Sequence, residues 1–154
     1  MRSVIRKPDA DGLIPLEEEI FNVEQLVGIY KLRYAESVYI SFHKQGDTNE
    51  MRILPHTLTT LVENGLKHGE IHDANHPFFI QLIISDDTIL FETHNKKRIG
   101  PKELSHGIGM KFLRAHLNTV YENCYNLSIN EDDTFYAAEL VIAIKEKVAV
   151  AVDS

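Results

Sequence analysis

The chain has 154 residues, 44% of them hydrophobic and 25% charged, which are the proportions of a single globular domain rather than of a disordered or fibrous chain. Its 16 lysines and arginines against 23 aspartates and glutamates give a net charge of −7, which argues against nucleic acid as a partner. The one cysteine, Cys124, cannot form a disulfide within the chain, and no apolar run approaches the roughly 20 residues of a membrane-spanning helix.

The chain begins with a segment that is expected to be a linker arm. Residues 1–15 carry few apolar side chains, and they contain Pro8, Gly12 and Pro15, which interrupt regular structure. Residues 16–145 follow as the one predicted domain. Residues 146–154 are a weakly patterned tail that is expected to fray.

Hydrophobic periodicity within the predicted domain indicates both helices and strands. Helices are expected over 15–34, 55–69 and about 110–121. Strands are expected over 37–44, 51–54, 78–85, 88–94, 125–130 and 134–144. Because the strands cluster in hairpins with helices between them, the sequence predicts an α+β protein built as a two-layer sandwich.

One face of the second predicted helix is polar. Thr60, Asn64, Lys67 and His68 share this face, apart from the leucine stripe, and Glu63 lies beside it. A neutral amide oxygen together with two potential cationic donors suits a hydrated magnesium ion and anionic oxygens. The alternative is a solvated helix face with an ion pair between Glu63 and Lys67, and composition alone favours that alternative.

A long loop without hydrophobic periodicity is predicted over 95–109, and loops of this length are often functional lids. Lys96, Lys97 and Arg98 lie near its start, and Gly107-Ile108-Gly109 lies at its end, where the third helix begins. Paired glycines at a helix start let backbone N–H groups approach a phosphate closely. A simple helix entry turn explains the same pair equally well.

Histidines recur every four residues at positions 68, 72 and 76. On a continuous helix this spacing would form a metal-binding stripe. Gly69 and Pro77 argue against a continuous helix, because glycine favours a helix end and proline cannot continue one. A zinc site is therefore the weakest of the functional hypotheses.

Taken in chain order, three segments resemble a single family. PLEEEIFNVEQLVGIYKLRY, LPHTLTTLVENGLKHG and HGIGMKFLRAHLNTVY are similar to the catalytic domain of LytS-type sensor histidine kinases of the GHKL ATPase superfamily. The resemblance covers about residues 14–144, and its most specific element is LVENGLKHG, the asparagine box. It implies the Bergerat ATP-binding fold, in which three helices cover a mixed, mostly antiparallel sheet.

The resemblance also implies roles for residues of the second helix. Asn64 would coordinate the Mg²⁺ that bridges the ATP phosphates. Lys67 and His68 would lie near those phosphates, and Glu63 would polarise a water molecule or the metal shell. These four residues are the catalytic candidates, and Asn64 is the candidate metal ligand.

The two glycine boxes of the family compare differently with this chain. The second box is matched by Gly107, Ile108, Gly109 and Met110. The first box normally reads Asp-x-Gly-x-Gly, and its Asp receives the adenine amino group. Here Asn95 occupies the Asp position and Lys97 that of the first glycine. Asn95 can still accept a hydrogen bond through its side-chain oxygen, but it brings no negative charge.

By this resemblance the chain is the catalytic domain of a bacterial two-component histidine kinase, with ATP and Mg²⁺ as cofactors. It would transfer the γ-phosphoryl group to a histidine on a dimerisation segment outside this sequence, and it would act indirectly on a response regulator. The parent is expected to be a homodimer anchored in the inner membrane, with this domain in the cytoplasm. The alternative is a degenerate GHKL-fold module, a non-catalytic signalling or interaction domain, because the first glycine box is altered.

Overall fold

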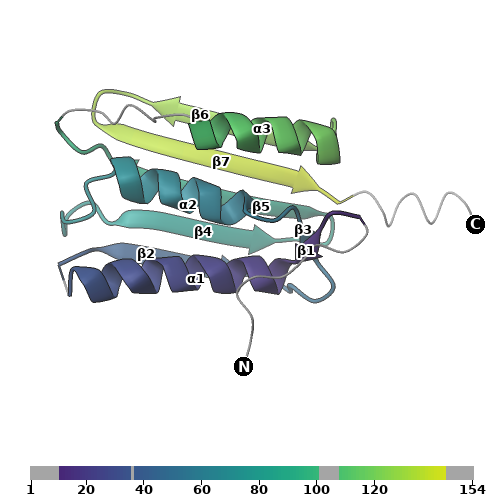
Figure 1. Cartoon of the computed structure of the whole chain (residues 1–154), viewed down its shortest axis with the longest axis horizontal. Helices are drawn as coiled ribbons and strands as arrows, with labels where there is room; N and C mark the ends of the chain where they lie inside the picture. The colour runs from purple at the N-terminus through teal and green to yellow at the C-terminus, as the bar shows by residue number, and fades with distance from the viewer. Residues whose placement is uncertain (1–10, 36, 101–107, 145–154) are drawn as a thin grey trace, which may run out of the picture.

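A computed structural model describes residues 11–35, 37–100 and 108–144 of the chain. Figure 1 shows two layers, with helices side by side on one face of a sheet. The helices are α1 (Leu16–Arg33), α2 (Thr57–His68) and α3 (Ile108–Tyr121). The strands are β1 (Ile14–Pro15), β2 (Ile40–Gln45), β3 (Arg52–Ile53), β4 (Phe78–Ile84), β5 (Thr88–Lys96), β6 (Tyr125–Glu131) and β7 (Phe135–Ala143). The predicted two-layer α+β sandwich is confirmed.

The main sheet of the described residues has the order β2-β4-β5-β7-β6. Only β2 and β4 pair in parallel, and the other neighbours pair antiparallel. A parallel pair needs a crossover, and α2 lies in the chain between these two strands. The sheet is therefore mixed and mostly antiparallel, as expected.

A small second sheet holds the start of the domain. Ile14 pairs with Ile53 and Pro15 with Arg52 in the antiparallel pair of β1 and β3. The Arg52 guanidinium also donates to the backbone oxygen of Leu13 and to the Asp11 carboxylate. Residues 11–15, which the sequence placed in the linker arm, thus pack on the domain.

The core lies between the sheet and the helices. In β4 the buried side chains alternate regularly, from Phe78 through Ile80 and Leu82 to Ile84. In β5 the corresponding positions end in two polar residues, Thr93 and Asn95, which are only 2% exposed. This alternation places the two polar side chains on the face of β5 that packs against the helices, near the end of the strand.

The start of α2 is capped by a residue from α1. Glu19 is fully buried, and its Oε1 accepts the backbone N–H groups of Leu58 (2.9 Å) and Thr59 (3.3 Å). These are two of the four donors that the first turn of a helix cannot satisfy itself. The carboxylate therefore both satisfies the helix terminus and complements its partial positive charge.

Gly65 lets α2 lie close to the sheet. A Cβ atom at this position would lie 2.3 Å from Cζ of Phe78, far inside van der Waals contact. Since Phe78 is itself 1% exposed at the start of β4, the ring has little room to move. A glycine in the middle of this helix is thus required by packing.

Several element boundaries differ from those predicted, and β2 begins at Ile40 rather than at residue 37. β5 continues through Asn95 and Lys96, which were assigned to the loop, because both residues pair with β7. α3 begins at Ile108 rather than near Met110. Residues 101–107 of the predicted lid lie outside the described residues, as do residues 1–10 and the predicted tail at 146–154. Along the described ranges, no helix has both the length and the apolar character needed to cross a bilayer.

Candidate functional site

Asn64 lies on α2, where its side chain is hydrogen-bonded to the hydroxyl of Tyr136 on β7. Burial raises the pKa of Tyr136, and the hydrogen bond with Asn64 opposes that shift without cancelling it. Tyr136 therefore stays a neutral phenol near neutral pH. No local motif marks Tyr136 as a site residue, although alternation along the last strand places it on the same face as the buried Ala138 and Leu140.

Asn95 lies beside Tyr136, its partner in the ladder between β5 and β7. Its Nδ2 donates to the backbone oxygen of Lys96 at 3.1 Å, whereas its Oδ1 is buried and has no hydrogen-bond partner among the described residues. The buried Thr93 Oγ1 on the same strand also has no partner. A buried unsatisfied acceptor costs about 1–3 kcal/mol, so such atoms are candidates for contact with a ligand.

The end of α2 is held over Asn95 by backbone hydrogen bonds. Glu70 N donates to Lys96 O at 2.7 Å, and Arg98 N donates to His68 O at 3.0 Å. Gly69 lies between these two bonds, and a Cβ atom there would be 3.0 Å from Nδ2 of Asn95. The structure thus brings Asn64, His68 and Asn95 to one end of α2.

Two lysines near the end of β5 pair with carboxylates. Nζ of Lys96 lies 2.9 Å from Oδ2 of Asp73, and Nζ of Lys97 lies 2.5 Å from Oε1 of Glu131. The hydrogen bond from Lys96 is the main reason that the pKa of Asp73 lies well below its usual range, and His76 adds to the effect. Both lysines are therefore engaged within the chain, which makes them less available for contact with a phosphate.

The start of α3 approaches the polar face of α2. A Cβ atom on Gly109 would lie 3.8 Å from Cγ2 of Thr60, so the two helices are in contact there. A cavity of about 470 Å³ opens beside this contact and is also lined by His56, Phe112 and His116. Of the second glycine box, Gly109 thus lies next to α2, Met110 is half-buried, Ile108 is exposed, and Gly107 lies outside the described residues.

The remaining candidates on α2 are less enclosed. Glu63 and Lys67 are exposed, whereas Asn64 and His68 are half-buried. No ion pair between Glu63 and Lys67 is seen among the contacts of the described chain. Of these four candidates, Asn64 and His68 therefore lie between the helix layer and the sheet, whereas Glu63 and Lys67 lie at the surface.

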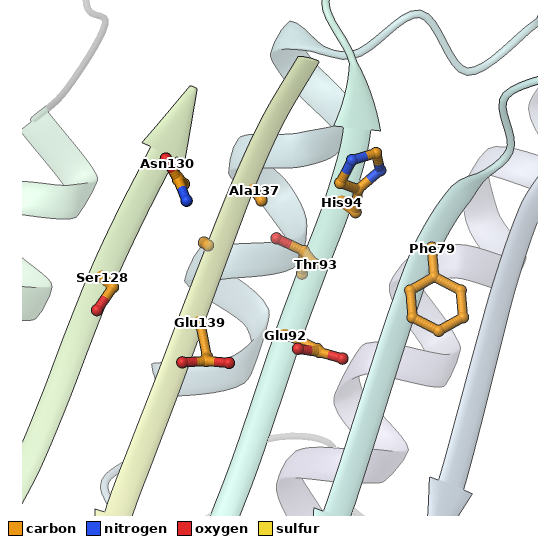
Figure 2. Close-up of a pocket in the computed structure, with 9 residues that line it drawn as sticks. Phe79, Glu92, Thr93, His94, Ser128, Asn130, Ala137 and Glu139 are labelled. Atoms are coloured by element: carbon orange, nitrogen blue, oxygen red, sulfur yellow. The ribbon is translucent and has the colours of Figure 1, made fainter. Parts of the chain in front are cut away.

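A second hollow, of about 380 Å³, lies on the sheet face away from the helices. Figure 2 shows Glu92 and Glu139 on neighbouring strands there, with His94, Asn130 and Phe79 around them and the helices behind the sheet. Glu92 and Glu139 are directly paired in the ladder. Two adjacent carboxylates repel a polyphosphate, so this hollow is a poor candidate for an anionic ligand.

The spaced histidines make separate contacts. Nδ1 of His72 lies 2.8 Å from the backbone oxygen of Ser37, and Nδ1 of His76 lies 3.1 Å from Oδ2 of Asp73. Across the described ranges, no group of three or more histidine, cysteine, aspartate or glutamate side chains could hold a metal ion. The zinc hypothesis gains no support from this part of the molecule.

Solved structures of similar fold are catalytic domains of histidine kinases. The nucleotide-free catalytic domain of histidine kinase ThkA superposes with a TM-score of 0.60 at 13% identity, over 85% of this chain and 95% of that one. The Acinetobacter baumannii histidine kinase AdeS gives 0.58 at 8% identity, over 87% and 67%. The histidine kinase domain of Erythrobacter litoralis EL346 gives 0.53 at 15% identity, over 96% and 69%.

Sequence comparisons add no closer relative. No protein-family model matches the chain, and no curated protein matches it. At 8–15% identity the structural similarity establishes a shared fold. What the chain binds and does must therefore be argued from its own site.

Proposed function

We propose that the chain is the ATP-binding catalytic domain of a LytS-type two-component sensor histidine kinase. The main support is the position of Asn64. In a fold shared with histidine kinase catalytic domains, this asparagine lies half-buried on α2 and is hydrogen-bonded to Tyr136 on β7. Tyr136 is in turn paired with the buried Asn95 on the neighbouring strand, β5. The LVENGLKHG motif thus surrounds a residue at the boundary between the helix layer and the sheet.

The side chains present fit a magnesium nucleotide. Mg²⁺ in phosphate sites takes one or two protein oxygens and completes its shell with phosphate oxygens and water, and Asn64 can supply one such amide oxygen. The unpaired Oδ1 of Asn95 is an acceptor suited to an amino group such as that of adenine. When bound, the metal ion would neutralise charge on the phosphates.

The neighbouring residues would complete the phosphate end of the site. Lys67, exposed on α2, and His68 would contact phosphate oxygens, and Glu63 would orient a water molecule of the metal shell. Backbone groups of 107–110, at the start of α3, would approach the phosphates. In the proposed reaction the bond between the γ-phosphorus and the bridging oxygen breaks, a bond to an acceptor histidine nitrogen forms, and ADP leaves.

The proposed partners follow from the same function. Histidine kinase ThkA has been solved in complex with the response regulator protein TrrA, and this chain matches that kinase with a TM-score of 0.53. We propose that this domain likewise acts within a kinase that serves a response regulator. Its direct partner would be the dimerisation and phosphoacceptor helices of a homodimeric, membrane-anchored parent.

Calorimetric titration with ATP and ADP, with and without Mg²⁺, tests the proposal. We expect magnesium-dependent binding, and we expect Asn64→Ala to abolish it while the circular dichroism spectrum stays unchanged. Tyr136→Phe is the matched control, because it removes the same hydrogen bond and keeps the amide oxygen. If Tyr136→Phe weakens binding as much as Asn64→Ala, Asn64 acts through the fold and not as a ligand.

One observation favours the non-catalytic alternative. Asn95 is neutral, is held by the Lys96 backbone and lies in close contact with Gly69, which leaves little space over its side chain. If this alternative holds, millimolar nucleotide will produce neither calorimetric heat nor a rise in melting temperature, because only a ligand bound to the folded state stabilises it. Asn130→Ala, in the hollow of the opposite sheet face, controls for binding at that second place.

A further inference from the structure

The sheet has one face that points away from the helices, and none of the described helices covers it (Figure 2). Alternation along the strands places Gln81, Glu92, Glu139 and Ser128 on this open face. They form one row across the sheet, because each is paired with the next in the ladder. The carboxylates of Glu92 and Glu139 therefore lie side by side on neighbouring strands.

This pair of carboxylates is not explained by the fold of the chain. Like charges in directly opposite positions destabilise a sheet. Asp73, by contrast, pairs with the ammonium of Lys96. Glu92 accepts from a neutral donor, Nε2 of Gln81 at 3.1 Å, and neither Glu92 nor Glu139 pairs with a lysine or arginine of the described residues. The pair thus keeps two negative charges that a ligand could neutralise.

An aliphatic row lies on one side of the two carboxylates. Ile83, Leu90 and Val141 are paired across β4, β5 and β7, two residues along each strand from the acidic row. All three side chains remain partly exposed, because none of the described helices covers this face. The open face thus presents apolar surface directly beside its charges.

A band of aromatic rings lies on the other side of the carboxylates. The ring centroids of His43 and Phe79 are 5.6 Å apart, and those of His94 and Phe135 are 5.4 Å apart. Phe79 and His94 are paired in the ladder, so the band continues from β2 to the start of β7. Four neighbouring strands span about 14 Å at the usual strand spacing. The open face is therefore wide enough for a polypeptide segment and wider than a small molecule would cover.

The chemistry of this face selects a guanidinium. A hollow of about 380 Å³ lies over the two carboxylates and Phe79. A metal ion is a poor occupant, since the part of the chain that the structure describes has no group of three or more histidine, cysteine, aspartate or glutamate side chains that could hold one. A guanidinium has five N–H donors in one plane, so it can pair with two carboxylates and stack on a ring. An ammonium is a compact point charge that cannot do both.

We propose that the open face of the sheet binds an arginine side chain of a partner polypeptide. The guanidinium lies in the hollow, between Glu92 and Glu139 and against the ring of Phe79. The residues on either side of this arginine cover the aliphatic row and the ring band, which excludes water from the ion pairs. The contact lies on the opposite side of the sheet from α2, so it does not depend on the proposed nucleotide function.

An NMR titration of the ¹⁵N-labelled full chain with the peptide acetyl-Val-Arg-Val-amide tests the proposal. We expect a dissociation constant on the order of 1 mM, with amide shifts concentrated around Glu92 and Glu139. The same peptide with citrulline in place of arginine is the matched control, because citrulline has nearly the same shape and no charge. It should bind at least about tenfold more weakly. Equal binding of the two peptides, or no shifts on the open face at about 10 mM peptide, overturns the proposal.

Ethylguanidinium distinguishes a polypeptide from a small-molecule ligand. It carries the charged group but nothing that could cover the flanking rows, so it should bind at least about threefold more weakly than the arginine peptide. Ethylguanidinium that binds as tightly as the peptide overturns the assignment to a polypeptide.

Glu139→Gln and Asp86→Asn separate the open face from the net charge of the chain. Each removes one negative charge, but Asp86 lies exposed in the turn between β4 and β5. Glu139→Gln should weaken binding of the arginine peptide at least about fivefold, whereas Asp86→Asn should change it by less than about twofold. Equal effects would show that the peptide responds only to overall charge, which contradicts the proposal.

The melting temperature of the free chain provides a second readout. Glu139→Gln should raise it by about 2 °C, because the substitution removes the repulsion between Glu139 and Glu92. A side chain that serves only the stability of the sheet would give the opposite result. A Glu139→Gln variant that melts at a lower temperature and binds the arginine peptide as before overturns the proposal.

Discussion

Each end of α2 has a buried polar side chain with an unpaired oxygen, but the two side chains differ in chemistry. At the first end, Glu19 accepts two backbone N–H groups through Oε1, and its Oε2 has no partner. At the other end, the buried Oδ1 of Asn95 has no partner either, within the part of the chain that the structure describes. A carboxyl group can relieve its burial by binding a proton, which is why the pKa of Glu19 is raised, but an amide cannot. No described residue donates to Oδ1 of Asn95, so a donor on a ligand would satisfy it.

This difference separates a residue that holds the fold, Glu19, from one that would contact the nucleotide under the proposed function, Asn95. Substitutions at the first end of α2 should change stability and leave nucleotide affinity intact. Substitutions at the second end should do the reverse. The largest expected effect comes from a change that lifts the whole helix from the sheet.

Gly65→Ala should affect both ends together. The new methyl group would overlap the Phe78 ring, and overpacking of this kind costs about 1–3 kcal/mol, more than the helix propensity that alanine gains. Urea denaturation measures the change in the free energy of unfolding. Gly28→Ala, at a position where a Cβ atom would meet nothing within 4 Å, is the control with the opposite sign. A Gly65→Ala variant as stable as the unaltered chain would contradict the packing argument.

Glu19→Ala should affect the first end alone. Two buried N–H groups lose their acceptor, so we expect a loss of about 1–2 kcal/mol in the free energy of unfolding. Under conditions where the variant is folded, its magnesium–nucleotide affinity should equal that of the unaltered chain. A variant that kept its stability would show that the cap contributes nothing.

The same carboxyl group should make stability depend on pH. Burial raises the pKa of Glu19 above its ordinary value of 4.5, so the folded state binds the proton more tightly than the unfolded state. Stability should therefore fall as the pH rises from about 4.5 through the raised pKa. Glu19→Gln keeps an acceptor and carries no charge. Its unfolding midpoint should therefore lack the pH dependence that Glu19 contributes, when both chains are compared from about pH 4.5 upward.

Asn95→Ala should affect the second end alone, with the smallest change in stability. Lys96 O still accepts from Glu70 N after the amide is removed, and the unsatisfied Oδ1 disappears, so we expect a loss of about 1 kcal/mol or less. Nucleotide affinity should fall about tenfold or more, because a donor of the ligand loses its acceptor. Unchanged affinity measured by titration would place the adenine elsewhere.

Local patterns predicted most of the fold, and the errors lie where distant segments meet. The helix of the asparagine box and the hairpins followed from periodicity and turn residues. The extension of β5 through Lys96 did not, because its hydrogen bonds go to Glu70 at the end of α2 and to β7. The pairing of Ile14 with Ile53 was missed for the same reason.

The candidate site could likewise be predicted from the sequence only in part. Asn64 was predicted from a local motif, whereas Tyr136 is its neighbour only because α2 packs on the sheet. The pairing of Lys96 with Asp73 and of Lys97 with Glu131 also depends on tertiary contacts. A sequence shows that charges are present, but it does not show which of them neutralise one another.

The parallel pairing of β2 with β4 has a consequence for how the chain folds. β4 and β5 are joined by residues 85–87, and β6 and β7 by residues 132–134, so both hairpins can close within microseconds. β2 can pair with β4 only after the intervening chain, including α2, has been brought into place. Loop closure must precede this contact, so we expect β2 to join the sheet late and its pairing to limit the folding rate.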